Sequence, residues 1–237
     1  RMQWFLDLLE NPEKDFKYIN ITGTAGNGTV ASMIQQALVK QGRKAGLFTS
    51  PFVTTYIEKI QVGDLYIDPL EFAQIVEEMK PKIDEAFAKC PWGGPSYFER
   101  FLAIALLYFQ KQKCEWVVLE VGCGGRYDAT NVIPAPVMSA ITNVDYDHMH
   151  ILGKTLTKIA WDKSGIIKKG SVFFTTETRP RLREIIKQEC MKHGAEFNYV
   201  QGGNRELVEA MGLTAEEVKL PARFEIIQTK PLVIIDG

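Results

Sequence analysis

The stretch Y-I-N-I-T-G-T-A-G-N-G-T, residues 18–29, decides the fold. Residues 18–22 are suited to a short buried strand, and residues 23–28 contain three glycines of a loop. Beyond the loop, apolar side chains recur every three or four positions, at Val30, Ile34, Ala37 and Leu38, which is the spacing of one helical face. The sequence therefore predicts a strand, a glycine loop and a helix in succession.

The rest of the chain alternates short apolar runs with longer helical stretches, the pattern of βαβ units around a parallel sheet. Further strands are expected at residues 45–48, 59–62, 116–121, 138–143, 171–175 and 232–235. The clearest helices are expected at residues 69–88, 96–112, 155–163 and 179–193. We therefore predict an α/β fold with an open, mostly parallel sheet flanked by helices.

Nothing in the sequence marks an internal domain boundary, because it contains no repeat, low-complexity tract or Ser/Gly linker. We expect one domain over residues 1–237. The last apolar strand runs directly to the end of the chain. We therefore expect the natural protein to continue beyond it.

Composition narrows the class of partner. The 237 residues include 28 Lys and Arg against 29 Asp and Glu, a net charge of -1, so there is no basic excess to attract nucleic acid or an anionic membrane. No apolar run approaches the ~20 residues of a membrane helix, and the first residues do not resemble a signal peptide. The four cysteines lack metal or disulfide spacing. We expect a cytoplasmic protein without nucleic-acid or membrane partners.

The glycine loop is a candidate phosphate site. Backbone N–H groups between a strand and a helix, together with the positive helix end, can hold phosphates. A complete phosphate loop also supplies a lysine, and its place holds Asn27 here. A tight structural turn remains the alternative interpretation of this segment.

Glu120 is a candidate metal ligand. It lies near the carboxyl end of the strand expected at residues 116–121, where ligand crevices of open α/β sheets are found. A carboxylate there can bind Mg²⁺. The structural alternative is a surface glutamate or an ion pair with Arg126.

The segment D-x-D-H-x-H, residues 145–150, also follows an expected strand and is dense in metal-ligand types. A metal-dependent hydrolase, with Zn²⁺ or Mn²⁺ activating water, would use such a segment. Solvated loop residues are the other interpretation, more so for His150 than for His148.

Lys163 lies at the end of an expected helix that is followed by a glycine and further lysines. Helix capping and the helix dipole alone would explain these residues.

Taken together, these segments resemble the folylpolyglutamate synthase and dihydrofolate synthase family of the Mur ligase superfamily. The pair E-V-G-x-G-G-R-x-D-A-T-N and D-K-S-G-I is the most specific part of the resemblance. The motifs that carry it are G-T-A-G-N-G-T (23–29), T-S-P-F (49–52), I-E-K-I (57–60), F-E (98–99), E-V-G-C-G-G-R-Y-D-A-T-N (120–131), D-H-x-x-I-L-G (147–153), I-A-W-D-K-S-G-I-I (159–167), A-R-F-E (222–225) and I-I-D-G (234–237).

The resemblance implies an ATP-dependent ligase that joins a folate or pteroate carboxylate to the amine of glutamate through an acyl phosphate. It implies Mg²⁺ ligands at Ser50, Glu120 and His148, catalytic roles for Glu120, His148 and Lys163, and a carbamylated side chain at Lys163. Residues 50–60, with Lys59 where the family usually has Arg, would border the folate pocket. A monomer is expected for the full-length protein. The implied nucleotide-binding loop consists of Gly23, Thr24, Ala25, Gly26, Asn27, Gly28 and Thr29.

Several positions depart from the family pattern. Ala25 and Asn27 replace the Asn and Lys of the usual loop, Phe52 stands where His is common, and Ala222 replaces a Gly. The family's second domain would follow residue 237. A charge-assisted hydrogen bond is worth roughly 1.5–3 kcal/mol, so Asn27 leaves open a degenerate nucleotide- or folate-binding relative without ligase activity. The hydrolase is the third possibility.

Overall fold

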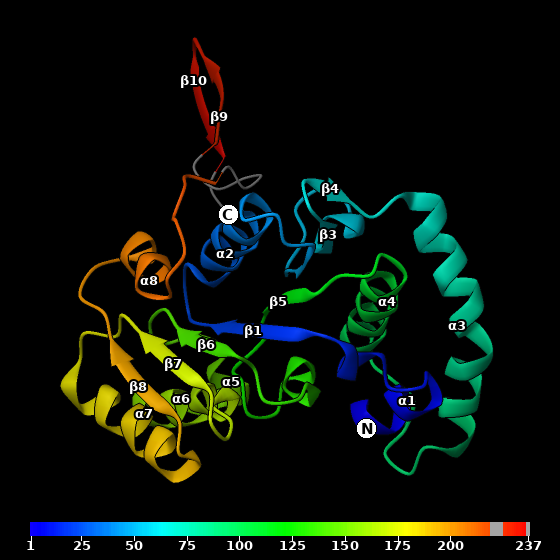
Figure 1. The fold of residues 1–237 in the computed structure, drawn as a ribbon, viewed down its shortest axis with the longest axis horizontal. Coiled ribbons are helices and arrows are strands. Elements are labelled where there is room, and N and C mark those ends of the chain that lie inside the picture. Colours follow the sequence, from blue (N-terminus) through cyan, green and yellow to red (C-terminus); the bar gives the residue numbers. More distant parts are fainter. Residues whose placement is uncertain (219–224, 236–237) are drawn as a thin grey trace.

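The computed structural model describes residues 1–218 and 225–235. Its centre is an eight-stranded sheet with the strand order β4-β3-β2-β5-β1-β6-β7-β8 (Figure 1). Strands β3 and β4 are antiparallel to their neighbours, and the other pairs are parallel. The strands are β1 Lys17–Thr22, β2 Ala45–Phe48, β3 Ile60–Val62, β4 Leu65–Tyr66, β5 Trp116–Glu120, β6 Met138–Ile141, β7 Val172–Thr175 and β8 Glu196–Tyr199. The predicted open, mostly parallel sheet is confirmed.

Helices cover both faces of this sheet. The α-helices are α1 Met2–Leu8, α2 Asn27–Lys40, α3 Pro69–Lys89, α4 Tyr97–Lys111, α5 Met149–Leu152, α6 Leu156–Lys163, α7 Pro180–His193 and α8 Asn204–Ala210. Short 3-10 helices are η1 Pro12–Asp15, η2 Tyr56–Lys59, η3 Ala129–Val132 and η4 Ser164–Ile166. None of the helices in the described part of the chain is long and apolar enough to cross a membrane.

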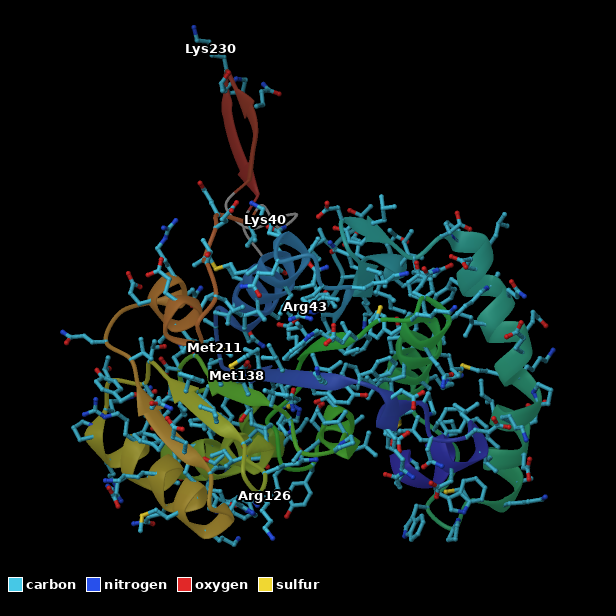
Figure 2. The ribbon with its side chains drawn as sticks, viewed as in Figure 1. Lys40, Arg43, Arg126, Met138, Met211 and Lys230 are labelled. Carbon is cyan, nitrogen blue, oxygen red and sulfur yellow. The ribbon has the colours of Figure 1, made fainter. Side chains whose placement is uncertain are left out.

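Alternation along β1 explains how the two faces are built. Ile19 and Ile21 point toward α2 and α8, where Met138 and Met211 also pack (Figure 2). Tyr18, on the opposite face, packs in a cluster that contains side chains of α1, α3 and α4. Successive strand side chains point to opposite faces, so residues 18–22 are buried on both sides of the sheet, although the polar Asn20 and Thr22 interrupt the apolar residues.

The parallel registers bring several strand ends to one edge. Ile21 pairs with Glu120 of β5, and Thr22 pairs with Ile141 of β6. The glycine loop after β1 therefore emerges between the carboxyl ends of β5 and β6. This is the edge where open α/β sheets bind ligands.

The structure also contains elements that the sequence analysis did not find. Among them, β8 is an edge strand whose side chains are only partly buried, so it lacks an apolar run. The last predicted strand, β10 Leu232–Ile235, pairs with β9 Glu225–Thr229 in a separate antiparallel hairpin instead of extending the parallel sheet. The hairpin projects away from the sheet (Figure 1). Residues 222–224 and 236–237 of the quoted motifs lie outside the described residues.

Candidate functional site

The glycine loop connects β1 to α2, as predicted. Gly26 has φ +80°, a left-handed conformation that favours glycine, and α2 starts at the next residue, Asn27. A Cβ on Gly23 would overlap the Thr142 hydroxyl. The first N–H groups of α2 have no acceptor within the helix, so they are available to a ligand or to water.

A residue that the sequence analysis missed shapes this loop. The side-chain Oδ1 of Asn143 accepts from the N–H of Thr24 at 3.0 Å and from that of Ala25 at 2.9 Å. The Thr142 hydroxyl donates to the Ala25 carbonyl at 2.6 Å. Asn143 is the second residue after β6 and the last residue of the strand expected at residues 138–143, and this position at the carboxyl edge of the sheet was the available signal.

The residues predicted to act together line one cavity of about 140 Å³ at this edge. Its walls are Thr22, Gly23, Thr24, Asn27, Ser50, Pro51, Glu120, Val121, Gly122, Cys123, Gly124, Asp147, His148 and Lys163. Ser50, Glu120, His148 and Lys163 are therefore brought to the phosphate loop from four different segments. The remaining predicted loop residues, Ala25, Gly26, Gly28 and Thr29, do not line this cavity.

Glu120 is a buried member of this set, with 4% of its surface exposed. Its Oε2 accepts from the backbone N–H of Ser50 at 2.8 Å. A Cβ placed on Gly28 would come within 3.0 Å of its Oε1. The carboxylate thus lies against the first turn of α2, which excludes the surface-glutamate alternative.

Lys163 is the last residue of α6. Its side chain is buried, with 3% of the residue's surface exposed, and does not extend into solvent. Its Nζ donates to the Gly23 carbonyl at 2.8 Å. Burial lowers the pKa of Lys163, and electrostatic interactions with Cys123 and Asp147, among others, oppose that shift. The ammonium therefore holds the base of the phosphate loop.

His148 has a left-handed backbone, with φ +45°, and its side chain is 46% exposed. Its Nε2 lies 3.6 Å from Asp147 Oδ2, and its ring centroid lies 6.3 Å from that of His150. His150 does not line the cavity. Within residues 1–218 and 225–235, no group of three or more His, Cys, Asp or Glu side chains is arranged to hold a metal ion.

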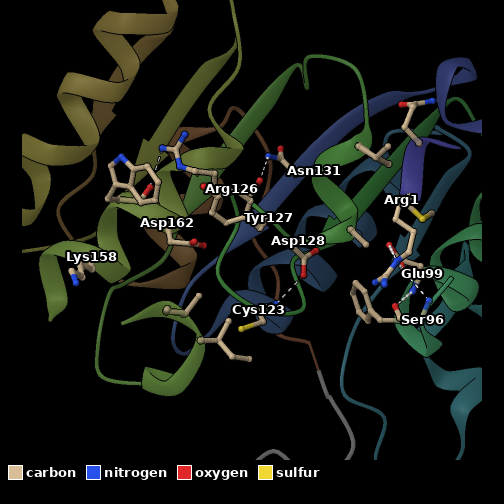
Figure 3. A pocket seen from close by; sticks show the side chains of 18 residues that line it. Arg1, Ser96, Glu99, Cys123, Arg126, Tyr127, Asp128, Asn131, Lys158 and Asp162 are labelled. Carbon is tan, nitrogen blue, oxygen red and sulfur yellow. Dashed lines mark hydrogen bonds and ion pairs between the residues drawn. The ribbon is translucent and has the colours of Figure 1, made fainter. Parts of the chain in front are cut away.

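A second, larger cavity has a volume of about 1000 Å³, and Figure 3 shows the side chains that line it. Phe98, Tyr127, Asp128 and Asp162 are among its walls, and Cys123 lines both cavities. Cys123 is therefore a wall common to the two cavities. A third cavity, of about 330 Å³, borders the other side of the loop at Ala25 and Asn143.

The segment expected to border a folate pocket, residues 50–60, contributes Ser50 and Pro51 to the phosphate-loop cavity but nothing to the large one. Lys59 is buried, and its ammonium lies 5.1 Å from the ring centroids of Tyr97 and Phe101 and 5.8 Å from that of Phe98. Phe98 is also a wall of the large cavity. The segment therefore reaches that space only through a neighbouring ring.

A parallel sheet, a glycine loop between its central strand and a helix, and polar side chains gathered at the loop define a phosphate-loop α/β protein. No family model matches the chain. It is 38% identical over 198 residues to a dihydrofolate synthase/folylpolyglutamate synthase of Bacillus subtilis, covering 83% of this chain and 46% of that protein. A folylpolyglutamate synthase of Lacticaseibacillus casei is 32% identical, with 83% and 46% covered.

Solved structures agree with these relatives. The folylpolyglutamate synthase of Thermotoga maritima superposes with a TM-score of 0.87 at 30% identity, over 100% of this chain and 66% of that one. A folylpolyglutamate synthase complex with AMPPCP and folate gives a TM-score of 0.90 at 26% identity, over 100% and 71%. The chain belongs to the folylpolyglutamate synthase and dihydrofolate synthase family of the Mur ligase superfamily. It spans about half the length of the curated relatives it matches.

Proposed function

We propose that this chain is the nucleotide-binding part of an ATP-dependent ligase that adds glutamate to a folate or pteroate carboxylate through an acyl phosphate. The observation that carries the proposal is the cavity in which Asn27, Ser50, Glu120, His148 and Lys163 meet. These side chains come from separate segments, and the ligase family predicts their convergence. A second domain in a longer protein would complete the ligase, which we expect to be a cytoplasmic monomer.

The nucleotide phosphates are assigned to the loop of residues 23–29 and the start of α2. The N–H groups of the first turn and the positive end of a 14-residue helix favour an anion there. Asn27 lines the cavity and can donate one hydrogen bond through its amide. It adds no charge, so the helix and bound cations must offset more of the phosphate charge than in a loop with lysine.

Magnesium would be held by Ser50, Glu120 and His148. A hydroxyl, a buried carboxylate and an imidazole border the same 140 Å³ cavity, and this mostly oxygen donor set suits a cation that retains several waters. When bound, Mg²⁺ would neutralise charge developing on the transferring phosphoryl group. The described donors therefore fit the ion.

The large cavity is assigned to the acceptor substrate. It is big enough for a ligand of drug size, it has an aromatic wall at Phe98, and it shares Cys123 with the cavity at the phosphate loop. An acceptor bound there could place its carboxylate beside the loop, while the protein walls keep water from the acyl phosphate. The hydrogen bond from Lys163 Nζ to the Gly23 carbonyl supports a role for this lysine beside the reacting groups, and we expect it to be carbamylated in the active enzyme.

A degenerate relative that binds nucleotide or folate without ligation is the second candidate. Asn27 favours it, and so does the capture of the Thr24 and Ala25 N–H groups by Asn143, because those groups are not offered to phosphate in this conformation. The hydrolase alternative is not supported by the relatives, which are named as synthases.

The deciding experiment is an ATPase and ligase assay on the full-length protein that contains this chain, with Asn27→Lys in parallel. Formation of ADP and a glutamylated product that depends on folate or pteroate, glutamate and Mg²⁺ would support the ligase. Nucleotide binding without product in the parent, with activity gained in Asn27→Lys, would support the degenerate relative. No product from either protein would refute the ligase proposal.

A further inference from the structure

Two segments far apart in sequence are joined tightly behind the site. The loop after β5, residues 122–131, packs against the end of α6 and the start of η4, residues 161–165. Arg126 N–H donates to the Asp162 carbonyl at 2.9 Å, and its Nη2 donates to the Trp161 carbonyl at 3.1 Å. The Asn131 side chain donates to the Gly165 carbonyl at 3.0 Å. Three hydrogen bonds therefore join the two segments.

The side chain of Asp162, in residues 161–165, binds a glycine of residues 122–131. Its Oδ1 accepts from the buried Gly125 N–H at 2.9 Å, and only 8% of its surface is exposed. Among residues 1–218 and 225–235, the Gly125 N–H is the only hydrogen-bond donor to this carboxylate. A Cβ on Gly124 would overlap Asp162 Oδ1, so the fit depends on glycine.

Asp162 and Lys163 are consecutive, and their side chains reach different parts of the site. Asp162 lines the large cavity, where Figure 3 shows its carboxylate among the lining side chains. Lys163 lines the phosphate-loop cavity and donates to Gly23. The two residues are adjacent in the chain and each lines one of the two cavities. The hydrogen bond between Gly125 N–H and Asp162 therefore helps to hold the backbone from which the Lys163 side chain extends.

We propose that Asp162 is a positioning residue that keeps Lys163 against the phosphate loop by holding the end of α6 on Gly125. It acts through an accepting oxygen, so Asp162→Asn, whose amide oxygen can still accept from Gly125, should preserve the arrangement. Asp162→Ala should loosen the end of α6, because only the hydrogen bonds from Arg126 and Asn131 then remain. The effect on catalysis rests on the proposed ligase function, whereas the effect on Lys163 itself does not.

The first measurement needs no turnover. Full-length parent, Asp162→Asn and Asp162→Ala proteins are treated briefly with an amine-acetylating reagent in bicarbonate-free buffer, and acetylation of each lysine is read by peptide mass spectrometry. Lys59, buried among aromatic rings away from this anchor, is the internal control. In Asp162→Ala we expect about tenfold faster acetylation of Lys163, as for a locally opened contact, with Lys59 unchanged and with Asp162→Asn close to the parent.

The second measurement is ligase turnover of the same proteins. We expect Asp162→Ala to lower kcat by about 10- to 100-fold, as misplacement of a reacting group does, with little change in KM for ATP, and Asp162→Asn to recover most of it. Asp84→Ala, an exposed change on α3, should match the parent in both measurements. If the parent does not ligate, the proposed function fails and the acetylation result alone decides the positioning role.

Two acetylation results would overturn the proposal. Equal acceleration at Lys163 and Lys59 in Asp162→Ala would show general loosening of the fold. Unchanged acetylation of Lys163 would show that the contact with Gly23 does not depend on Asp162.

Discussion

Two glycine-rich loops leave neighbouring strands at the same edge of the sheet, and their glycines are needed for different reasons. The phosphate loop follows β1, and the loop of residues 122–125 follows β5. In the phosphate loop, the nearest atoms to an added Cβ are tips of side chains, such as Glu120 Oε1 at 3.0 Å from Gly28. In the second loop they include backbone, with the Lys163 carbonyl oxygen 2.7 Å from Gly125.

Side-chain tips can shift at low cost, whereas packed backbone cannot. Substitution of Gly28 should therefore alter the site and leave the fold intact. Substitutions in the loop of residues 122–125 should alter the fold first and the site only as a result. Similar glycine patterns in sequence thus mark a ligand-facing loop in one case and a close backbone contact in the other.

The largest expected effect concerns the polar side chains around the phosphate loop. Glu120→Gln in the full-length protein keeps an oxygen that can accept from the Ser50 N–H but removes the charge proposed to hold Mg²⁺. We expect ligase kcat to fall by about 100- to 1000-fold, the range for loss of one electrostatic group in a transition state. Steady-state kinetics measure this. Glu209→Gln, on the surface of α8, is the matched control, and near-parental activity of Glu120→Gln would remove Glu120 from the site.

The second prediction concerns the loop of residues 122–125. Gly125→Ala forces its Cβ against the Lys163 carbonyl and against Ile166 Cγ2, which lies 2.9 Å away. We expect it to lower the free energy of unfolding by about 1–3 kcal/mol, as overpacking does, measured by urea denaturation. Gly28→Ala lies in the first turn of α2, where Ala is a better helix former than Gly, so its stability should change little. Equal destabilisation by both substitutions would contradict the distinction between the loops.

The sequence predicted the elements that meet at the site better than the contacts between them. Strand β1, the loop and α2 were predictable because apolar periodicity and glycines are local signals. The burial of Lys163 was expected from the family resemblance and from its helical spacing to Ile159 and Ile166, although capping alone would explain the residues at this helix end equally well. The position of Asn143 at a strand end hinted at a site residue, but its contacts with Thr24 and Ala25 and the contact of Asp162 with Gly125 join residues distant in sequence, so no local pattern predicts those contacts.

The third prediction returns to the missing charge of the phosphate loop. Asn27→Lys should strengthen binding of AMPPCP with Mg²⁺ to the full-length protein by about tenfold or more, because a charge-assisted hydrogen bond is worth roughly 1.5–3 kcal/mol. Calorimetry measures the affinity. Gln41→Lys adds the same charge at the other end of α2, where the residue is exposed, and it should not change the affinity. The same gain in both variants would mean that net charge, and not the position in the loop, determines binding.

The smallest expected effect tests how firmly the segment after the second glycine loop is held. Lys168 Nζ donates to the Asn131 carbonyl at 2.7 Å and to the Ile133 carbonyl, and burial lowers the pKa of Lys168 to about 8. Below pH 8 the folded protein carries a partly buried cation at some cost in stability. Between pH 8 and the ordinary lysine pKa, the folded protein releases this proton while the unfolded chain keeps it, so this group's contribution to stability rises with pH.

Lys168→Met removes that titration while keeping most of the apolar stem. From pH 7.5 to pH 10, we expect the stability of the parent relative to Lys168→Met to increase by about 1 kcal/mol, a value reduced because the ammonium is partly screened by solvent. Urea denaturation at both pH values gives the difference, in which the titration of other groups cancels. Lys169→Met, an exposed neighbour, should show no such pH dependence. A parent that loses stability relative to Lys168→Met over this range would mean that the two carbonyl contacts favour the ammonium more than burial disfavours it, and that this segment is held by the charge itself.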